Sequence, residues 1–452
     1  MNAVSLQKMA PERVFVASSL KYRLENDWVV YRMQASLRTR YNLALEEACR
    51  ISIELQKPLK VIYHLNADFP EANYRHFNFL GQALAGISDT LSRHQIVFEL
   101  VAGDFEAAMH EAGRKAVCLV TDRGYLRIHR EQLRWLRENM ECPVIEVEDN
   151  LVVPIESASP KAEWAARTLR PKINAKAGYF SQYAGLPSVL TPWPALVAAD
   201  HRQNEQVLAQ ILQTVRQKHY LAPVALIGGE QTAAQLLNSF LSEKIAAYDS
   251  DRAIPARQGT SRLSAYLHFG MISPVEIYGK AALLPCAAAF LEQLLVRREL
   301  AHNFIYYTPR YDTFSAVPSW AALSLKKHAS DPRPRVYPLS VLEEAGTHDP
   351  YWNAAMREMI QTGYMENTMR MYWGKKIIEW TETPEEAYLR ILYLNNRYFL
   401  DGRDANSFAG VGWCFGLHDR PWQERPVFGM IRYMNETGLR RKQDMNLYID
   451  RF

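Results

Sequence analysis

The chain has 452 residues, which is more than a single domain of about 100–200 residues usually needs. Apolar residues make up 48% of the sequence and charged residues 23%, a balance that excludes a disordered, collagen-like or coiled-coil chain. Lys and Arg together number 53 against 49 for Asp and Glu, so the charge permits nucleic-acid binding without indicating it. Most of the ten tryptophans lie in the last third of the chain.

No stretch approaches the roughly 18 consecutive apolar residues of a membrane-spanning helix, and residues 1–11 lack the pattern of a signal peptide. The five cysteines are dispersed and never form a C-x-x-C pair, so neither a disulfide framework nor a metal site is expected. We therefore expect a monomeric protein of the reducing cytoplasm.

The first 150 residues alternate short apolar runs with amphipathic stretches of helical period. This alternation predicts a parallel sheet covered by helices over residues 1–152. No G-x-G-x-x-G follows any predicted strand, so a dinucleotide at the usual position is not indicated. The predicted strands are residues 14–17, 28–31, 59–65, 96–101, 116–121 and 144–147, and the predicted helices are 41–56, 77–93 and 127–139.

Residues 153–199 break this pattern, because prolines recur among serines, glycines and aromatic residues and no period holds. They are predicted to form a long ordered connector between two domains. Residues 200–452 are then predicted to form a mostly helical domain, since strand signals nearly vanish there. The predicted helices are 204–219, 232–250, 287–306, 348–363, 367–381 and 384–398.

A first motif places two hydroxyl residues, Thr260 and Ser261, after Gly259 and just before a predicted helix start. Hydroxyls and free backbone N–H groups at such a start can hold a phosphate. An ordinary helix capped by Ser or Thr would show the same residues, so both interpretations stay open.

A second motif, residues 367–380, places Arg370, Trp373 and Trp380 on one face of a predicted helix. The two indoles would lie about 10 Å apart along the helix axis, which is close enough for electron transfer between them. A large aromatic core face would have the same pattern.

The third and fourth motifs are rich in charge. Residues 400–406 contain an Asp-Gly-Arg-Asp turn that can meet a cationic partner, sugar hydroxyls or a flavin ring N–H, or simply form surface ion pairs. Residues 418–426 interleave arginines with Trp422 and lead to the basic run 440–442. Such a pattern suits phosphate contact and base stacking, although solvated Arg–Asp pairs on a loop would look much the same.

Together these segments resemble the class II cyclobutane pyrimidine dimer photolyases of the photolyase/cryptochrome superfamily. The resemblance implies a Rossmann-like antenna domain, a linker and an all-helical domain that holds FAD. It further implies light-driven repair of pyrimidine dimers in UV-damaged DNA by electron transfer from reduced FAD, a lyase reaction. The segments that carry it are residues 228–230, 259–270, 296–304, 347–355, 369–380, 400–404 and 418–426.

The resemblance also implies a role for particular residues. The FAD phosphate and ribityl side would meet Tyr248, Thr260, Ser261, Arg262, Leu263 and Ser264. The isoalloxazine ring would be lined by Arg298, Arg370 (paired with Asp401), Asn395, Asp401 and Asp404. An electron chain would run from Trp373 through Trp352 to Trp380 as its outer, solvent-facing member. The pyrimidine dimer would meet Gln293, Met371 and Trp413. DNA would be bound by Arg420, Trp422, Arg425, Arg432 and Lys442.

The chain departs from the family pattern in three places. Gln293 stands where dimer photolyases generally carry Glu, and Gln can donate a hydrogen bond but cannot ionise. This leaves open an altered lesion preference, or a cryptochrome-like photoreceptor without repair. Residues 34–38 are less polar than is usual, which leaves open whether the antenna chromophore is a deazaflavin, a folate, a flavin or absent. A single Gly416 stands where many members have two glycines, just before residues 418–426, the loop that the resemblance implies enters DNA.

Overall fold

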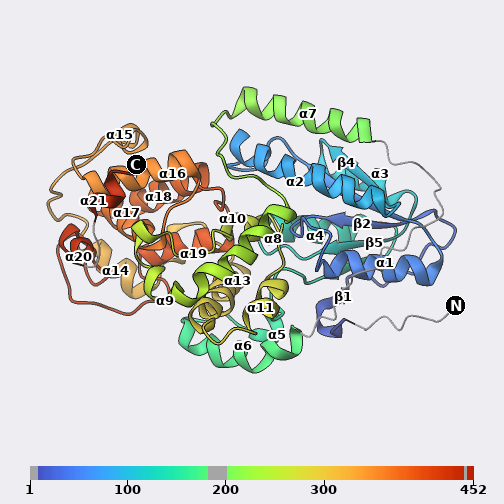
Figure 1. Cartoon of the computed structure of the whole chain (residues 1–452), viewed down its shortest axis with the longest axis horizontal. Coiled ribbons are helices and arrows are strands. Elements are labelled where there is room, and N and C mark those ends of the chain that lie inside the picture. Colours follow the sequence, from blue (N-terminus) through green and yellow to red (C-terminus); the bar gives the residue numbers. More distant parts are fainter. Residues whose placement is uncertain (1–8, 182–200, 442–444) are drawn as a thin grey trace.

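The structure is a computed structural model that describes residues 9–181, 201–441 and 445–452 (Figure 1). The predicted architecture, an α/β domain followed by a helical domain, is confirmed. Within the described ranges, every strand of the sheet lies before residue 148, and the later part has only an isolated bridge between Arg425 and Gly429.

The sheet has the strand order β1-β6-β5-β2-β3-β4, and its neighbours run parallel except for β1 beside β6. Strand β5 is buried along its whole length, as expected where helices cover both faces of a sheet. The chain order reverses between β2 and β5, and the carboxyl ends of parallel strands open a crevice at such a switch point. The strands are β1 (Val14–Val16), β2 (Trp28–Met33), β3 (Leu59–Leu65), β4 (Val97–Ala102), β5 (Ala116–Asp122) and β6 (Val144–Val147).

The first two helices of the α/β domain start at side-chain caps: Asn42 accepts from the N–H of Leu45, and Asn73 caps the next helix. The last helix on this sheet, α7, lies along α2 (Figure 1) and contacts β4, although the sequence places it in the predicted second domain. These helices are α1 (Leu43–Leu55), α2 (Tyr74–Arg93), α3 (Phe105–Gly113), α4 (Arg127–Asn139) and α7 (His201–Lys218).

The predicted connector contains two helices, α5 (Ile155–Ala158) and α6 (Ala166–Phe180), before residues 182–199, which lie outside the described part. Helix α6 holds Pro171 inside it, and this proline is one reason why no helical period is visible in the sequence. The division at residues 152 and 199 stays a prediction.

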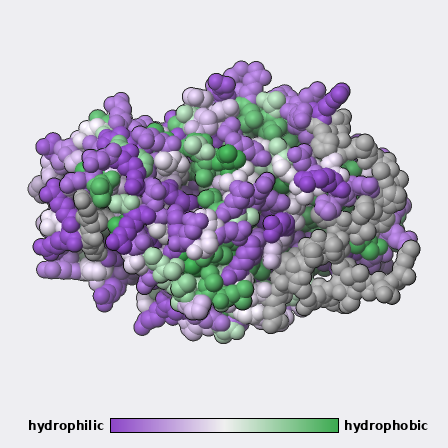
Figure 2. Space-filling model, viewed as in Figure 1, coloured by the Kyte–Doolittle hydropathy of each residue, from purple (hydrophilic) through white to green (hydrophobic). Residues whose placement is uncertain are grey.

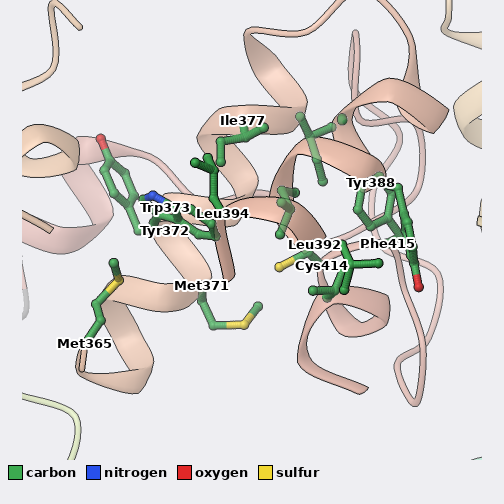
Figure 3. Close-up of a cluster of buried hydrophobic side chains, with 14 of the residues drawn as sticks. Met365, Met371, Tyr372, Trp373, Ile377, Tyr388, Leu392, Leu394, Cys414 and Phe415 are labelled. Carbon is green, nitrogen blue, oxygen red and sulfur yellow. The ribbon is translucent and has the colours of Figure 1, made fainter. Parts of the chain in front are cut away.

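The helical domain is built around one large aromatic core, part of which is drawn in Figure 3. Two π-helical turns, Phe240–Lys244 and Glu292–Arg297, interrupt its helices. The helices are α8 (Glu230–Ser239), α9 (Tyr248–Asp251), α10 (Ser264–His268), α11 (Pro274–Ala281), α12 (Ala288–Leu291), α13 (Arg298–Tyr307), α14 (Ser319–Lys327), α15 (Leu339–Glu343), α16 (Pro350–Thr362), α17 (Asn367–Glu379), α18 (Pro384–Tyr398), α19 (Ala405–Cys414), α20 (Glu436–Arg440) and α21 (Asn446–Ile449).

The two domains meet closely at Gly270. Its φ is +71°, and a Cβ there would lie 1.8 Å from the carbonyl oxygen of Ala35 in the α/β domain, so only glycine fits. Arg38 donates to the Gly270 carbonyl at 3.0 Å while it forms a buried ion pair with Asp149. The joint is therefore a packed, hydrogen-bonded contact.

The molecular surface is mixed. On the face in Figure 2, hydrophobic residues form small separate patches among hydrophilic ones. Of the helices in the described ranges, none is both long and apolar enough to cross a membrane.

Candidate functional site

Three tryptophans form a continuous row in the helical domain. Trp352 of α16 lies between Trp373, in the middle of α17, and Trp380, which directly follows the last residue of that helix. Its ring is nearly parallel to that of Trp373, at 10° with centroids 6.4 Å apart, and it meets Trp380 edge-on at 5.6 Å. All three are buried, and Trp373 belongs to the cluster in Figure 3. The order of the row is the one that the resemblance implied.

The prediction that Trp380 faces solvent is wrong, because only 1% of its surface is exposed. Tyr337 and His348 cover it, with ring centroids 5.3 and 5.4 Å from that of the indole. His348 is exposed and its Nδ1 lies 2.7 Å from the hydroxyl of Tyr337. The helical period indicated that Trp380 shares a face with Trp373, but it carried no information about the loop that covers this end of α17.

An ion pair stands at the other end of the row. Arg370 donates to both oxygens of Asp401 at 2.8 and 3.0 Å, as the resemblance implied. Phe399 links this pair to the tryptophans, since its ring lies 3.8 Å from the Arg370 guanidinium and meets Trp373 at 6.5 Å. Asn395 of α18 is buried, and its side-chain N–H donates to the side-chain oxygen of Asn396 at 3.0 Å.

The hydroxyl motif forms a loop before α10, and no side chain caps that helix, so the interpretation as an ordinary capped helix start is not supported. Thr260 is joined by hydrogen bonds to Tyr364 at 2.8 Å and to Glu366 at 3.3 Å. Arg262 has a φ of +58° and lies 3.8 Å over the ring of Tyr364. The loop is thus fixed against the segment that precedes α17.

Arg298 and Asp404 lie in a separate cluster at the domain joint. They line a small cavity of about 60 Å³ with His268 and His302. Burial alone would raise the pKa of Asp404, but the neighbouring His268, His302 and Arg298 together lower it well below its usual range. Arg298 also donates to the carbonyl of Asn150 at 2.9 Å, across the joint. The structure therefore divides the predicted ring-lining residues into two groups.

The remaining predicted cofactor residues lie on the adjacent side of the domain. Tyr248 is buried in α9 against Phe240 and Phe290, with ring centroids 5.6 and 5.5 Å away. Burial raises the pKa of its phenol to about 12, so it stays neutral. Leu263 is buried and Ser261 accepts from its N–H at 3.4 Å, while Ser264 begins α10.

A larger cavity, of about 150 Å³, opens at the switch point of the sheet, where β2 ends at Met33 and Gln34 follows. Two arginines, Arg32 and Arg403, line it, and burial lowers the pKa of each to about 10, so both stay cationic at pH 7. Its histidines are His64, His76, His129 and His268. Burial lowers the pKa of His129 to about 3, so that ring is neutral and the arginines give the cavity its positive charge.

Gln293 lies in the π-helical turn Glu292–Arg297 and is half-buried. Turns of this type often occur at functional sites. The adjacent Glu292 is held by Arg170 at 2.8 Å and by Arg297 at 3.2 Å, so its charge is compensated and its side chain is fixed away from solvent. The sequence showed no sign of the extra residue in this turn.

The other predicted lesion and DNA residues lie around the loop 418–432. Met371 of α17 is buried, and Trp413 of α19 is half-buried. The guanidinium of Arg432 lies 5.9 Å from the ring of Trp413 and 5.1 Å from that of Trp422. Arg432 therefore stands between the two tryptophans, which sequence spacing did not indicate.

Two further arginines of this loop lie over aromatic rings. Arg420 lies 5.7 Å from the ring of Trp422, whose indole N–H donates to Asp419 at 3.1 Å. Arg425 lies 5.3 Å from the ring of Tyr433. Lys442 lies outside the described residues.

The loop is anchored to α14 and the turn after it. Ser324 accepts from the N–H of Met430 at 2.8 Å, and Asp331 accepts from that of Val427 at 2.8 Å. His328 contacts Asp331 and Glu424 through its two ring nitrogens, at 2.6 and 3.0 Å. These anchors were not predicted, since no sequence signal links residues about 100 positions apart.

Several known proteins are similar to this chain. The DNA photolyase family model matches residues 29–196. The deoxyribodipyrimidine photo-lyase of Methanothermobacter thermautotrophicus is 42% identical, with 95% of each chain covered, and that of Oryza sativa subsp. japonica is 39% identical, with 93% of this chain and 86% of the relative covered.

Solved structures share the fold at low identity. A class III photolyase from Agrobacterium tumefaciens aligns with a TM-score of 0.72 at 18% identity over 100% of this chain and 88% of that one. An archaeal photolyase from Sulfolobus tokodaii, solved with two FAD molecules, gives 0.73 at 16% identity over 94% and 90%. The fold is thus that of photolyases and cryptochromes.

The sequence identity to the curated relatives extends over nearly their whole length. It therefore supports a family assignment, whereas the solved structures support only the fold. The chain belongs to the DNA photolyase family. It is an enzyme, since several curated relatives that are 34–42% identical over most of the chain are named deoxyribodipyrimidine photo-lyase.

Proposed function

We propose that the protein is a class II photolyase, which uses light to reverse cyclobutane pyrimidine dimers in DNA with reduced FAD as its cofactor. The observation that carries this proposal is the row of Trp373, Trp352 and Trp380, which leads away from the Arg370–Asp401 pair. A buried row of indoles in contact that ends at a half-buried arginine is more than a core needs for packing alone.

The residues present fit FAD. Two buried polar atoms among them have no partner within the described residues, the indole Nε1 of Trp373 and the Oε2 of Glu366. A carboxylate oxygen beside Thr260 suits the hydroxyls of a ribityl chain, and an indole N–H suits a ring carbonyl. When bound, reduced FAD supplies, on excitation by blue or near-UV light, the electron that opens the cyclobutane bonds and is then recovered, so there is no net redox change.

Arg370 and Asp401 would hold the flavin ring. The guanidinium brings a fixed positive charge to one edge of the pocket, and Asp401 keeps it in place through two hydrogen bonds. A cation in a buried pocket stabilises negative charge there more strongly than it would in water. Asn395 can serve as a donor or as an acceptor, so it tolerates either protonation state of a ring nitrogen.

The three indoles would conduct electrons between this pocket and the end of α17, where Tyr337 and the exposed His348 cover Trp380. Each ring is in contact with the next, and each is buried, so the path crosses no water. Their purpose would be to restore the reduced cofactor, separately from repair.

The loop 418–432 would bind damaged DNA. A dimer is poorly stacked, so it flips out of the duplex at modest cost. Trp413 and Met371 would pack on the joined bases, and Gln293 would donate a hydrogen bond to a base edge. Arg420 and Trp422 would enter the gap in the duplex, while Arg425, Arg432 and Lys442 would contact phosphates.

The cavity at the switch point would hold an antenna chromophore. Ligands of doubly wound sheets bind at this place, and the cavity opens there between the sheet and the helical domain's Arg403. Arg32 and Arg403 favour an anionic one, whether a deazaflavin, a folate or a flavin. An absorption spectrum of the purified protein, with and without Arg32→Ala, would reveal a second chromophore.

The decisive experiment illuminates photoreduced, FAD-containing protein with a duplex that carries one thymine dimer, and in parallel with a duplex that carries one 6-4 photoproduct. We expect reversal of the dimer only. Reversal of the 6-4 product alone would support the altered lesion preference that Gln293 raises. If neither lesion is reversed while FAD is bound and photoreducible, the repair proposal fails and the cryptochrome-like alternative stands.

A further inference from the structure

Trp164 is held out in solvent on a rigid turn. Trp164 lies just before α6 and is 57% exposed. The N–H of Glu163 donates to Asn303 at 2.7 Å, and Asn303 donates to the carbonyl of Lys161 at 3.0 Å. Because α13 fixes the turn in this way, the exposure of the indole is a property of ordered structure. The indole therefore presents an ordered aromatic face to solvent, on which a base or a sugar can stack.

The charge beside this ring is positive. The guanidinium of Arg167 lies 5.1 Å from the indole centroid and is exposed. Two nearby cations are compensated, since Lys172 pairs with Glu163 and Arg170 pairs with Glu292. In the ranges that the structure describes, no carboxylate pairs with Arg167. Its charge is therefore free to meet an anion.

Trp164 is also connected to the loop 418–432. Its carbonyl oxygen lies 3.0 Å from Nδ1 of His418. Burial lowers the pKa of His418 to about 4, so the ring is neutral and Nδ1 carries the proton that it donates. Arg420, two residues after His418, is exposed. Its guanidinium lies over the ring of Trp422, which is 40% exposed. The hydrogen bond between His418 and Trp164 thus links two exposed Trp–Arg pairs. They are Trp164 with Arg167 and Trp422 with Arg420.

We propose that Trp164 and Arg167 form a second DNA-binding patch, which contacts the duplex beside the lesion. Arg167 neutralises a backbone phosphate, and the indole packs on a sugar or an unstacked base next to it. The inference rests on the proposed function, because it takes DNA as the partner of the neighbouring loop. DNA is favoured over an acidic protein, since an exposed ring next to an unpaired arginine matches the alternation of bases and phosphates.

The test measures the binding of a fluorescent duplex with one thymine dimer at several salt concentrations. Trp164→Ala should raise Kd about tenfold, because stacking on an aromatic ring contributes about 1–3 kcal/mol per base. Trp164→Phe should keep most of the affinity. Arg167→Gln should lower the slope of log Kd against log salt by about one, the value for one phosphate contact. The matched control is Tyr179→Ala. It removes a ring that is 54% exposed at the far end of α6, the helix that follows Trp164.

Each outcome decides the proposal. If Trp164→Ala binds like Tyr179→Ala and Arg167→Gln keeps the wild-type salt slope, the patch is wrong while the proposed function stands. If the wild-type protein does not bind the duplex at all, the proposed function fails and the patch fails with it. If Trp164→Ala does not fold, the salt slope of Arg167→Gln decides, because that exposed side chain makes no buried contact. If the variants bind the duplex like the wild type but lose affinity for a protein partner, the patch is a protein interface and the proposal is overturned.

Discussion

The indole N–H of Trp352 donates to the backbone carbonyl of Trp373 at 3.0 Å, and this bond holds the two rings nearly parallel. It joins α16 to α17 at the centre of the tryptophan row. The middle ring is thus positioned by its own hydrogen bond as well as by packing, which makes it the most informative member of the row to change.

Trp352→Phe should slow photoreduction of the bound flavin by at least about tenfold. The smaller ring widens the gap between Trp373 and Trp380, and loss of the hydrogen bond should lower the free energy of unfolding by about 1–2 kcal/mol. The rate is measured from the flavin absorption under blue light with an external reductant. Trp135→Phe, in the α/β domain, is the control. Photoreduction at the wild-type rate in Trp352→Phe would reject the row as the electron path.

Asp401→Asn should weaken the binding of FAD. The variant leaves Arg370 with a neutral partner in a pocket where it had two charge-assisted hydrogen bonds, and we expect a loss of about 2 kcal/mol. The temperature at which flavin fluorescence is released on heating measures the effect. Asp312→Asn breaks the more exposed pair with Arg127 and should change that temperature little. Equal shifts in the two variants would mean that the Arg370–Asp401 pair serves only general stability.

The sequence predicted local elements well where each element carries its own signal. Strands β3 and β6 and helices α4 and α18 have the bounds that periodicity and caps predicted. Helix α18 begins after Thr383, which accepts from the N–H of Glu386, with Pro384 at its first position. Such signals are contained within a few neighbouring residues.

Features that depend on distant contacts were not predictable in this way. The covering of Trp380 by Tyr337 and His348 comes from a loop some 40 residues away, and the position of Arg432 between two tryptophans depends on how a long loop folds back. The roles of individual site residues came from the resemblance to a family. The pairing of Arg370 with Asp401 was implied in the same way.

Gln293→Glu should increase dimer repair at acidic pH and should introduce a pH dependence. The wild-type amide cannot ionise, so its repair rate should be nearly flat between about pH 5 and 9. A carboxyl group can offer a proton only below its pKa, so the variant's rate should fall as pH rises, by about tenfold or more. Repair is followed by the recovery of the ultraviolet absorbance of the two thymines, which the dimer lacks. Glu292→Gln changes the neighbouring carboxylate and controls for charge. Flat profiles in both proteins would remove residue 293 from the chemistry.

His328 should make the anchoring of the loop 418–432 depend on pH. Its ring donates to Glu424 and to Asp331, and these hydrogen bonds raise the pKa of the imidazole above its usual value. Lys327, which pairs with Glu424 at 2.8 Å, is the other cation at this carboxylate. Because the folded-state pKa is raised, the stabilisation is fully present below the unfolded pKa of about 6.5, and it is lost as pH rises through the folded value.

His328→Gln should therefore lower Tm more at pH 6 than at pH 8.5. The amide keeps one hydrogen bond but no charge, so the variant should also bind damaged duplex with an affinity that varies less with pH than that of the wild type. Thermal melts and duplex titrations at both pH values measure the two effects. Lys327→Gln is the matched control, because its amine contacts the same Glu424 but does not titrate in this range. A difference in Tm between wild type and His328→Gln that is the same at both pH values would mean that the ring anchors the loop in its neutral form.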